Sequence, residues 1–250
     1  MPEGGEMTFW DHLDALRGTL VRMLVAVLLC SVAIFCMKTW VFDGLIFAPT
    51  RPDFFVYQWL KADVNVNLVN LDISAQFFTH IKVALMLGLI VSFPYLIFEL
   101  WRFIAPALYQ REKSAVKKAF GFASVLFYLG VAVGYIFVFP VTLQFFQGYS
   151  ISESLTNTFS LQSYISMLTS LVLLFGIVFE FPSVLAVLSK MGLVTRNTLR
   201  KYRRHAIVAI LVVSAIITPA DPVSMLIAAA PLYLLYELSV FVCAKEVKGV

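Results

Sequence analysis

The stretch MLVAVLLCSVAIFCM, residues 23–37, carries no charged side chain and lies between Arg22 and Lys38. With its apolar neighbours it predicts a helix long enough to cross the hydrocarbon core of a bilayer. Five further apolar runs follow, and the six predicted spans cover about residues 20–40, 77–100, 119–139, 164–188, 205–218 and 223–243. We therefore expect residues 1–250 to form one all-α polytopic membrane domain, with a polar external cap over about residues 43–75.

The composition supports a membrane protein and excludes several other classes. The chain has 250 residues, of which 60% are hydrophobic and 14% charged, and its mean hydropathy is +0.87. A water-soluble domain of this size needs more polar surface, so the excess apolar surface must face lipid. Cys30, Cys36 and Cys243 lie in apolar runs without metal-ligand spacing. No nucleotide-binding or hydrolase motif is present, so we predict no enzyme, cofactor or metal site.

The distribution of cationic residues predicts the orientation. Fifteen of the 19 Lys and Arg residues fall at the N-terminus, in the second and fourth loops and at the C-terminus, and four, Lys38, Arg51, Lys61 and Lys82, fall on the other side. Cytoplasmic loops carry the excess of Lys and Arg, so both termini are expected in the cytoplasm. Because these cations flank membrane spans, nucleic-acid binding is not expected.

Prolines and span lengths predict the shapes of the helices. Pro94 removes a backbone hydrogen bond inside the second run, so we expect that helix to bend. Pro140 is expected to end the third helix. The fifth run is too short to cross a normal bilayer untilted, and the last two helices are expected to form a short hairpin.

Glu180 is the ionisable residue that lies deepest in a predicted span, and Pro182 follows it. A carboxylate at a helix centre costs about 2.5–3.5 kcal/mol on insertion scales, so its presence needs a reason. It is either a protonated group bonded to a neighbouring helix or part of a binding site. Glu99 and Glu237 lie closer to helix ends, where snorkelling or pairing with a loop is the simpler interpretation.

The second loop departs from a plain basic loop. Residues 101–113, WRFIAPALYQREK, place an aromatic and apolar stretch before Glu112, which stands between Arg111 and Lys113. Such a site suits a peptide that carries arginines, because guanidinium and carboxylate form paired charge-assisted hydrogen bonds. The alternative is a solvated Glu112 that pairs with its neighbours and contributes little.

Short motifs spread over about residues 12–241 resemble one known family. They are His12-Leu13 with Leu16-Arg17; Ser92-Phe93-Pro94 followed by Trp101, Phe103, Pro106-Ala107-Leu108-Tyr109 and Glu112; Tyr135 through Phe139-Pro140; Phe175-Gly176 through Phe179-Glu180 and Pro182; Thr218-Pro219 with Asp221; and Pro231 through Tyr236-Glu237. In these motifs the chain resembles TatC, the multispanning receptor subunit of the twin-arginine protein translocase. The resemblance implies a cup-shaped receptor in the bacterial inner membrane that uses the proton-motive force to export folded proteins.

The resemblance also implies roles for particular residues. Signal-peptide binding is expected of Glu112, Phe103, Arg17, Asp14, Leu16, Pro106 and Tyr109; Glu180 and Pro182 are expected to face a groove for partner subunits; and Pro49 and Asp221 are expected in functional external elements. The implied partners are twin-arginine signal peptides and TatA-like and TatB-like single-span subunits, in homo- and hetero-oligomers. Ala15 stands where the family usually has Glu, and Asp14 is the nearest acid.

A different function class remains open from the residues. A proton-coupled secondary transporter would use the intramembrane Glu180 and depend little on the second loop. A receptor would depend on Glu112 and Phe103 instead.

Overall fold

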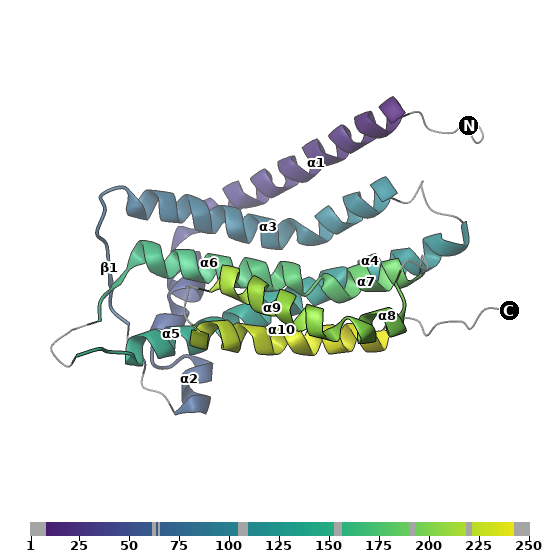
Figure 1. Ribbon diagram of the computed structural model, residues 1–250. Coiled ribbons are helices and arrows are strands. Elements are labelled where there is room, and N and C mark those ends of the chain that lie inside the picture. Colours follow the sequence, from purple (N-terminus) through teal and green to yellow (C-terminus); the bar gives the residue numbers. More distant parts are fainter. Residues whose placement is uncertain are drawn as a thin grey trace.

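The protein is a bundle of long helices, seen here in a computed structural model that describes residues 9–61, 64, 66–104, 110–152, 157–190, 194–218 and 222–242. Figure 1 shows the long helices side by side, with the first residues of α1 (Phe9–Cys36) and the last of α10 (Pro222–Val242) at the same end of the bundle. The cap that contains α2 (Phe55–Leu60) lies at the other end.

Five helical segments among the described residues are long and apolar enough to cross a membrane. They are Leu13–Cys36, Ala75–Ile104, Gly121–Gly148, Leu161–Ser189 and Pro222–Phe241. The remaining predicted run is α9 (Arg203–Ile217), whose 15 residues span about 22 Å at 1.5 Å per residue. The expectation that the last two helices are both short is therefore right for α9 and wrong for α10. The apolar run of α10 continues through Pro231 for 21 residues.

The expected end of the third helix at Pro140 is wrong. α4 (Gln110–Val133) continues through the π-helical turn η4 (Gly134–Val138) into α5 (Phe139–Gly148), in which Pro140 occupies the first turn. A π turn already changes the hydrogen-bond spacing, so a residue without an N–H is tolerated directly after it. The expected bend of the second helix is visible in Figure 1, where α3 (Ala75–Ile104) curves along its length and contains Pro94.

Tyrosine hydroxyls hold the cap together and fasten it to the bundle. The cap contains η1 (Trp40–Ile46), η2 (Ala48–Thr50), α2 and β1 (Leu68–Val69), and β1 pairs in parallel with β2 (Phe159–Ser160). This short strand pair is a feature that the all-α expectation omitted. Within the cap, Tyr57 of α2 donates to the Pro49 carbonyl at 2.8 Å. From the bundle, Tyr164 donates to the Ile46 carbonyl at 2.6 Å and Tyr135 to the Leu45 carbonyl at 2.5 Å. Buried carbonyls of an irregular segment thereby gain hydrogen bonds.

Glycines let helices of the core approach closely. Gly130 and Gly134 on one face of the third span lie against α6 (Leu161–Val178), where a Cβ on Gly130 would stand 2.5 Å from the Phe175 carbonyl oxygen. Small residues four apart are a common device for close packing of membrane helices. The same region holds the stacked rings of Phe93 and Phe127, with centroids 3.5 Å apart.

α1 lies at the periphery and packs mainly against α3, to which it runs antiparallel (Figure 1). Only 11% of its apolar segment is buried within the chain. The helices approach closely at Ser31 and Gly88, where an added Cβ would lie 2.8 Å from the Ser31 nitrogen. The rings of Phe35 and His80 stack at 3.8 Å. The angle of α1 therefore depends on its packing against one partner helix.

Candidate functional site

The residues predicted to bind a signal peptide belong to segments that meet at one end of the bundle. This end carries the first turns of α1, the last turn of α3 and the first turn of α4 (Figure 1). On α1, Asp14 and Arg17 are exposed and Leu16 is half-buried. Phe103 is half-buried in the last turn of α3.

Other predicted residues fall outside the described part of the chain. Glu112 is in the first turn of α4, but its side chain is outside the described residues, as are Pro106 and Tyr109 as a whole. The structure therefore places the helix that carries Glu112 and leaves the direction of its carboxylate as a prediction. Asp221 is also outside the described residues.

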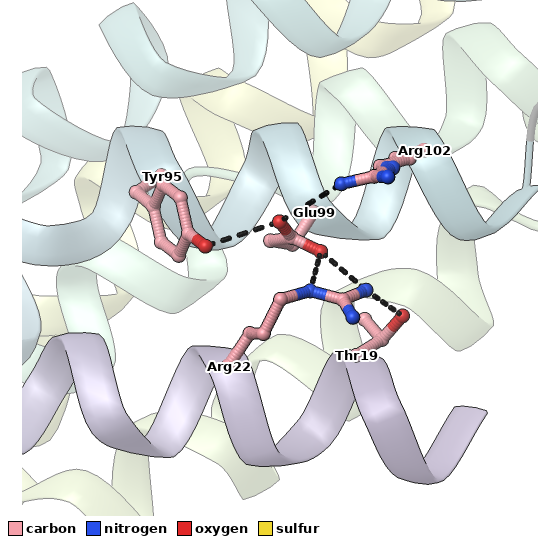
Figure 2. Close-up of polar contacts among 5 residues, drawn as sticks. All are labelled: Thr19, Arg22, Tyr95, Glu99 and Arg102. Atoms are coloured by element: carbon pink, nitrogen blue, oxygen red, sulfur yellow. Dashed lines mark hydrogen bonds and ion pairs between the residues drawn. The ribbon is translucent and has the colours of Figure 1, made fainter. Parts of the chain in front are cut away.

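An ionic cluster centred on Glu99 connects α1 to α3 at this end (Figure 2). Arg22 Nε donates to Glu99 Oε2 at 2.9 Å, and its Nη2 forms an ion pair with the same oxygen at 2.9 Å. Tyr95 donates to the other carboxylate oxygen at 3.1 Å, and Arg102 Nη1 lies 3.9 Å from that oxygen. Arg22 Nη2 also donates to the Thr19 hydroxyl at 3.1 Å. The carboxylate is therefore held by contacts from both helices.

In this cluster the carboxylate is buried and the two guanidinium groups are partly exposed. The Glu99 side chain is 2% exposed, whereas the side chains of Arg22 and Arg102 are 44% and 66% exposed. Glu99 is covered by its partners, and the interpretation that it snorkels toward water is wrong. Two guanidinium groups surround one carboxylate, so the cluster carries a net positive charge. The cations keep access to water while the carboxylate does not.

A second cluster of the same design joins α9 to α10. Arg203 Nη2 donates to Glu237 Oε2 at 2.6 Å, and Tyr233 donates to Glu237 Oε1 at 3.1 Å. The two glutamates stand in matching hexapeptides, YLIFEL at residues 95–100 and YLLYEL at residues 233–238. Tyr and Glu four residues apart share one helix face, so this repeated spacing is the signal that could have revealed both clusters.

Glu180 occupies a break in the fourth span. α6 ends at Val178 and α7 (Phe181–Lys190) begins after a turn at Phe179 and Glu180, beside the buried Pro182. Pro182 lies in the first turn of α7, where its missing N–H leaves no helical hydrogen bond unmade. The buried Glu180 Oε1 and Ser183 Oγ have no hydrogen-bond partner among the residues that the structure describes. A carboxyl oxygen without a partner at membrane depth is costly, so this position is not explained by packing alone.

A cavity of about 400 Å³ opens beside Glu180. Apolar side chains of α3, α4, α6 and α7 form nearly all of its wall, and Glu180 and Ser183 are its polar members. The lining includes Phe93, Ile97, Leu100, Ile104, Ala123, Ile177, Val184, Val187 and Leu188. The arrangement can accept an apolar segment that also offers one polar group to the carboxyl.

Pro49 is buried in η2, and its carbonyl accepts the Tyr57 hydrogen bond. Burial raises the pKa of the Tyr57 hydroxyl well above its usual value near 10. The hydroxyl therefore stays protonated as a donor at physiological pH. Among the described residues, no group of three His, Cys, Asp or Glu side chains gathers closely enough to hold a metal ion.

The sequence and the fold were compared with known proteins. The chain matches the family model for "Sec-independent protein translocase protein (TatC)" over residues 11–231. It is 36% identical to the protein of that name from Aquifex aeolicus, over 94% of both chains. It is 32% identical to the one from Escherichia coli, over 92% of this chain and 85% of the relative.

Solved structures agree with the sequence relatives. A crystal structure described as "Twin Arginine Translocase Receptor- TatC" superposes with a TM-score of 0.77 at 36% identity, covering 92% of this chain and 97% of the other. The same receptor in DDM gives a TM-score of 0.79 at 35% identity, covering 93% and 99%. From the motifs, the membrane-spanning helices and these similarities, the chain belongs to the TatC family, the polytopic membrane component of the Tat protein translocation pathway.

Proposed function

We propose that this chain is the receptor for twin-arginine signal peptides and the core subunit of a translocase that exports folded proteins with the proton-motive force. The observation that carries the proposal is that three segments lie at the same end of the bundle. These are the exposed first turns of α1, the end of α3 with Phe103 and the start of α4 with Glu112. A structure 36% identical to this chain is described as a twin-arginine translocase receptor, which supports the same role here.

The chemistry of recognition follows from the residue types. Glu112 supplies a carboxylate to the arginine pair, because a carboxylate accepts two parallel hydrogen bonds from one guanidinium. Leu16 and Phe103 are half-buried and offer apolar contact to the hydrophobic part of the peptide. Asp14 is exposed on α1, three residues from Arg17. It supplies the second carboxylate, because Ala15 stands where the family usually has a Glu.

The proposed orientation places the recognition end in the cytoplasm, with both termini on that side of the bacterial inner membrane. The described ends of α1 and α10 lie at the same end of the bundle (Figure 1). The basic residues of α8 (Arg196–Lys201) and of the start of α9 support this orientation. The cap with Pro49 then faces the opposite side.

The cavity beside Glu180 is the proposed docking place for the single helix of a TatA-like or TatB-like subunit in a hetero-oligomer. Its wall is apolar and it lies within the spans, so a membrane helix fits it better than a soluble peptide. A polar side chain on that helix would satisfy Glu180 Oε1 and Ser183 Oγ, which lack partners among the described groups. The groove also suits the concave, cup-like shape that we propose for the receptor.

Cross-linking of a signal peptide tests the receptor role. A twin-arginine signal peptide with a photoreactive group beside the arginine pair is incubated with vesicles that contain the full chain. We expect a cross-link to the wild type and strong loss with Glu112→Gln, because the neutral amide no longer attracts guanidinium. Glu180→Gln serves as the control and should leave capture unchanged. Equal capture by wild type and Glu112→Gln would refute the proposal.

Docking of partner subunits needs a separate readout. A photoreactive residue at Ile177, which is exposed and lines the cavity, should cross-link to a co-expressed single-span subunit. Glu180→Leu should abolish this product, because the polar contact is lost, while Glu112→Gln should preserve it. A cross-link that persists in Glu180→Leu would show that Glu180 takes no part in docking.

A further inference from the structure

Three contacts across the α1–α3 interface follow one antiparallel register. From the cap end toward the recognition end, they are Phe35 with His80, Ser31 with Gly88, and Arg22 with Glu99. The first two are stacking and close backbone approach, and the third is an ion pair. Each step toward the start of α1 is matched by a step toward the end of α3, as in a pair of packed antiparallel helices.

The ion pair lies directly beside the predicted recognition residues. One helical turn beyond Arg22 on α1 is Gly18, next to Arg17, and one turn beyond Glu99 on α3 is Phe103. The register therefore brings the stretch around Arg17 opposite the stretch around Phe103. Of the three contacts, the ion pair is the one nearest to the two walls of the proposed peptide site.

We propose that the Arg22–Glu99 ion pair is a positioning contact that fixes the start of α1 at a set distance from the end of α3. This inference rests on the proposed function, because it assigns the contact to the signal-peptide site. α1 packs chiefly against α3 and its apolar segment is only 11% buried, so loss of the ion pair nearest its start would let its first turns swing away from Phe103. The peptide could then contact the start of α1 or the end of α3 but not both at once, and it would bind more weakly.

The geometry favours positioning over direct peptide contact by Glu99. Its Oε2 accepts a hydrogen bond from Arg22 Nε and is ion-paired with Arg22 Nη2, and its Oε1 accepts one hydrogen bond from Tyr95 and lies near Arg102. With 2% exposure and both oxygens engaged, the carboxylate has little capacity left for an incoming guanidinium. Its effect on the peptide must pass through Arg22 and α1.

The Arg203–Glu237 cluster supplies a matched control. It has the same pairing of Arg, Glu and Tyr, but it joins α9 to α10 and does not touch α1 or α3. Arg203→Gln and Arg22→Gln therefore remove the same chemistry from two different helix pairs. A general loss of stability should follow from either change, whereas a change in peptide affinity should follow only from Arg22→Gln.

The test measures the dissociation constant of a fluorescent twin-arginine signal peptide for the purified full chain in nanodiscs. Arg22→Gln and Glu99→Gln should each weaken binding about tenfold, the scale of one lost charge-assisted hydrogen bond. The double variant should also lose about tenfold, because both single changes break one contact. Arg22→Lys, which keeps the charge but replaces the several guanidinium donors with one ammonium group, should weaken binding less than Arg22→Gln does.

The outcomes separate this inference from the function on which it rests. If the wild type does not bind the peptide, the receptor proposal itself fails. If the wild type binds and Arg22→Gln binds equally well, the positioning role alone is refuted. It is also refuted if the single losses multiply in the double variant, or if Arg203→Gln weakens binding as much as Arg22→Gln.

Discussion

Gly88→Ala should separate α1 from α3 and destabilise the protein. A methyl group at Gly88 would lie 2.8 Å from the Ser31 nitrogen and 2.9 Å from its Cα, and closer still to its hydroxyl oxygen. Ordinary contact between heavy atoms begins near 3.5 Å, so the backbone of α1 would have to move by about 0.6–0.7 Å. Ser31 is buried and its hydroxyl already donates to the Val27 carbonyl, so the side chain cannot simply turn away.

The expected cost combines two opposing effects. Overpacking of a close contact costs about 1–3 kcal/mol, while replacing Gly with Ala inside a helix recovers up to about 1 kcal/mol. Gly121→Ala isolates the second effect, because nothing lies within 4 Å of the added methyl group on α4. The free energy of unfolding of Gly88→Ala should therefore lie about 1–3 kcal/mol below that of Gly121→Ala.

Thermal unfolding of the purified chains in mild detergent measures this difference. For a chain of this size, about 1 kcal/mol corresponds to roughly 2–4 °C in the midpoint. Gly88→Ala should melt several degrees below Gly121→Ala, and its peptide affinity should fall because the start of α1 moves with the displaced backbone. Equal midpoints for the two variants would refute the close packing of Gly88 against Ser31.

Three further changes test other parts of the account. Tyr57→Phe leaves the Pro49 carbonyl without its donor and should cost about 1–3 kcal/mol at pH 7, measured by thermal unfolding. Because burial raises the pKa of Tyr57, the stabilisation by its hydroxyl is complete below pH 10 and declines above it. The difference in unfolding midpoint between wild type and Tyr57→Phe should therefore narrow in alkali, and a difference that stays constant with pH would contradict this. Glu180→Leu removes an unpartnered buried oxygen and should raise the midpoint of the isolated subunit, whereas a lower midpoint would reveal a hidden partner. Gly130→Ala should lower the midpoint, because its methyl group would press on the Phe175 carbonyl, and an unchanged midpoint would argue against that contact.

The sequence predicts the membrane spans well because their signal is local. An uncharged run such as residues 23–37 is sufficient to identify a span. The expectation at Pro140 fails because the effect of a proline depends on the hydrogen-bond pattern before it. The π turn at residues 134–138 has no recognisable sequence signal.

The ionic cluster could not be predicted because its partners are far apart in the chain. Arg22 and Glu99 are 77 residues apart, and their contact depends on the register of α1 against α3. Glu99 alone is indistinguishable from a glutamate that snorkels at a helix end. The Tyr95-to-Glu99 spacing gives the local half of the cluster, and its repetition at Tyr233 and Glu237 was the available clue. For the recognition site, the resemblance to the family names the residues. The structure adds that the described segments carrying them lie at the same end of the bundle.

The most direct test of the account compares two peptides that differ only in the arginine pair. Dissociation constants of a twin-arginine peptide and its twin-lysine counterpart are measured for the wild type and Glu112→Gln at low and high salt. The account predicts that the wild type prefers the arginine peptide, that salt weakens this binding, and that Glu112→Gln loses the preference. Equal affinity of the wild type for both peptides, unaffected by salt or by Glu112→Gln, would contradict it.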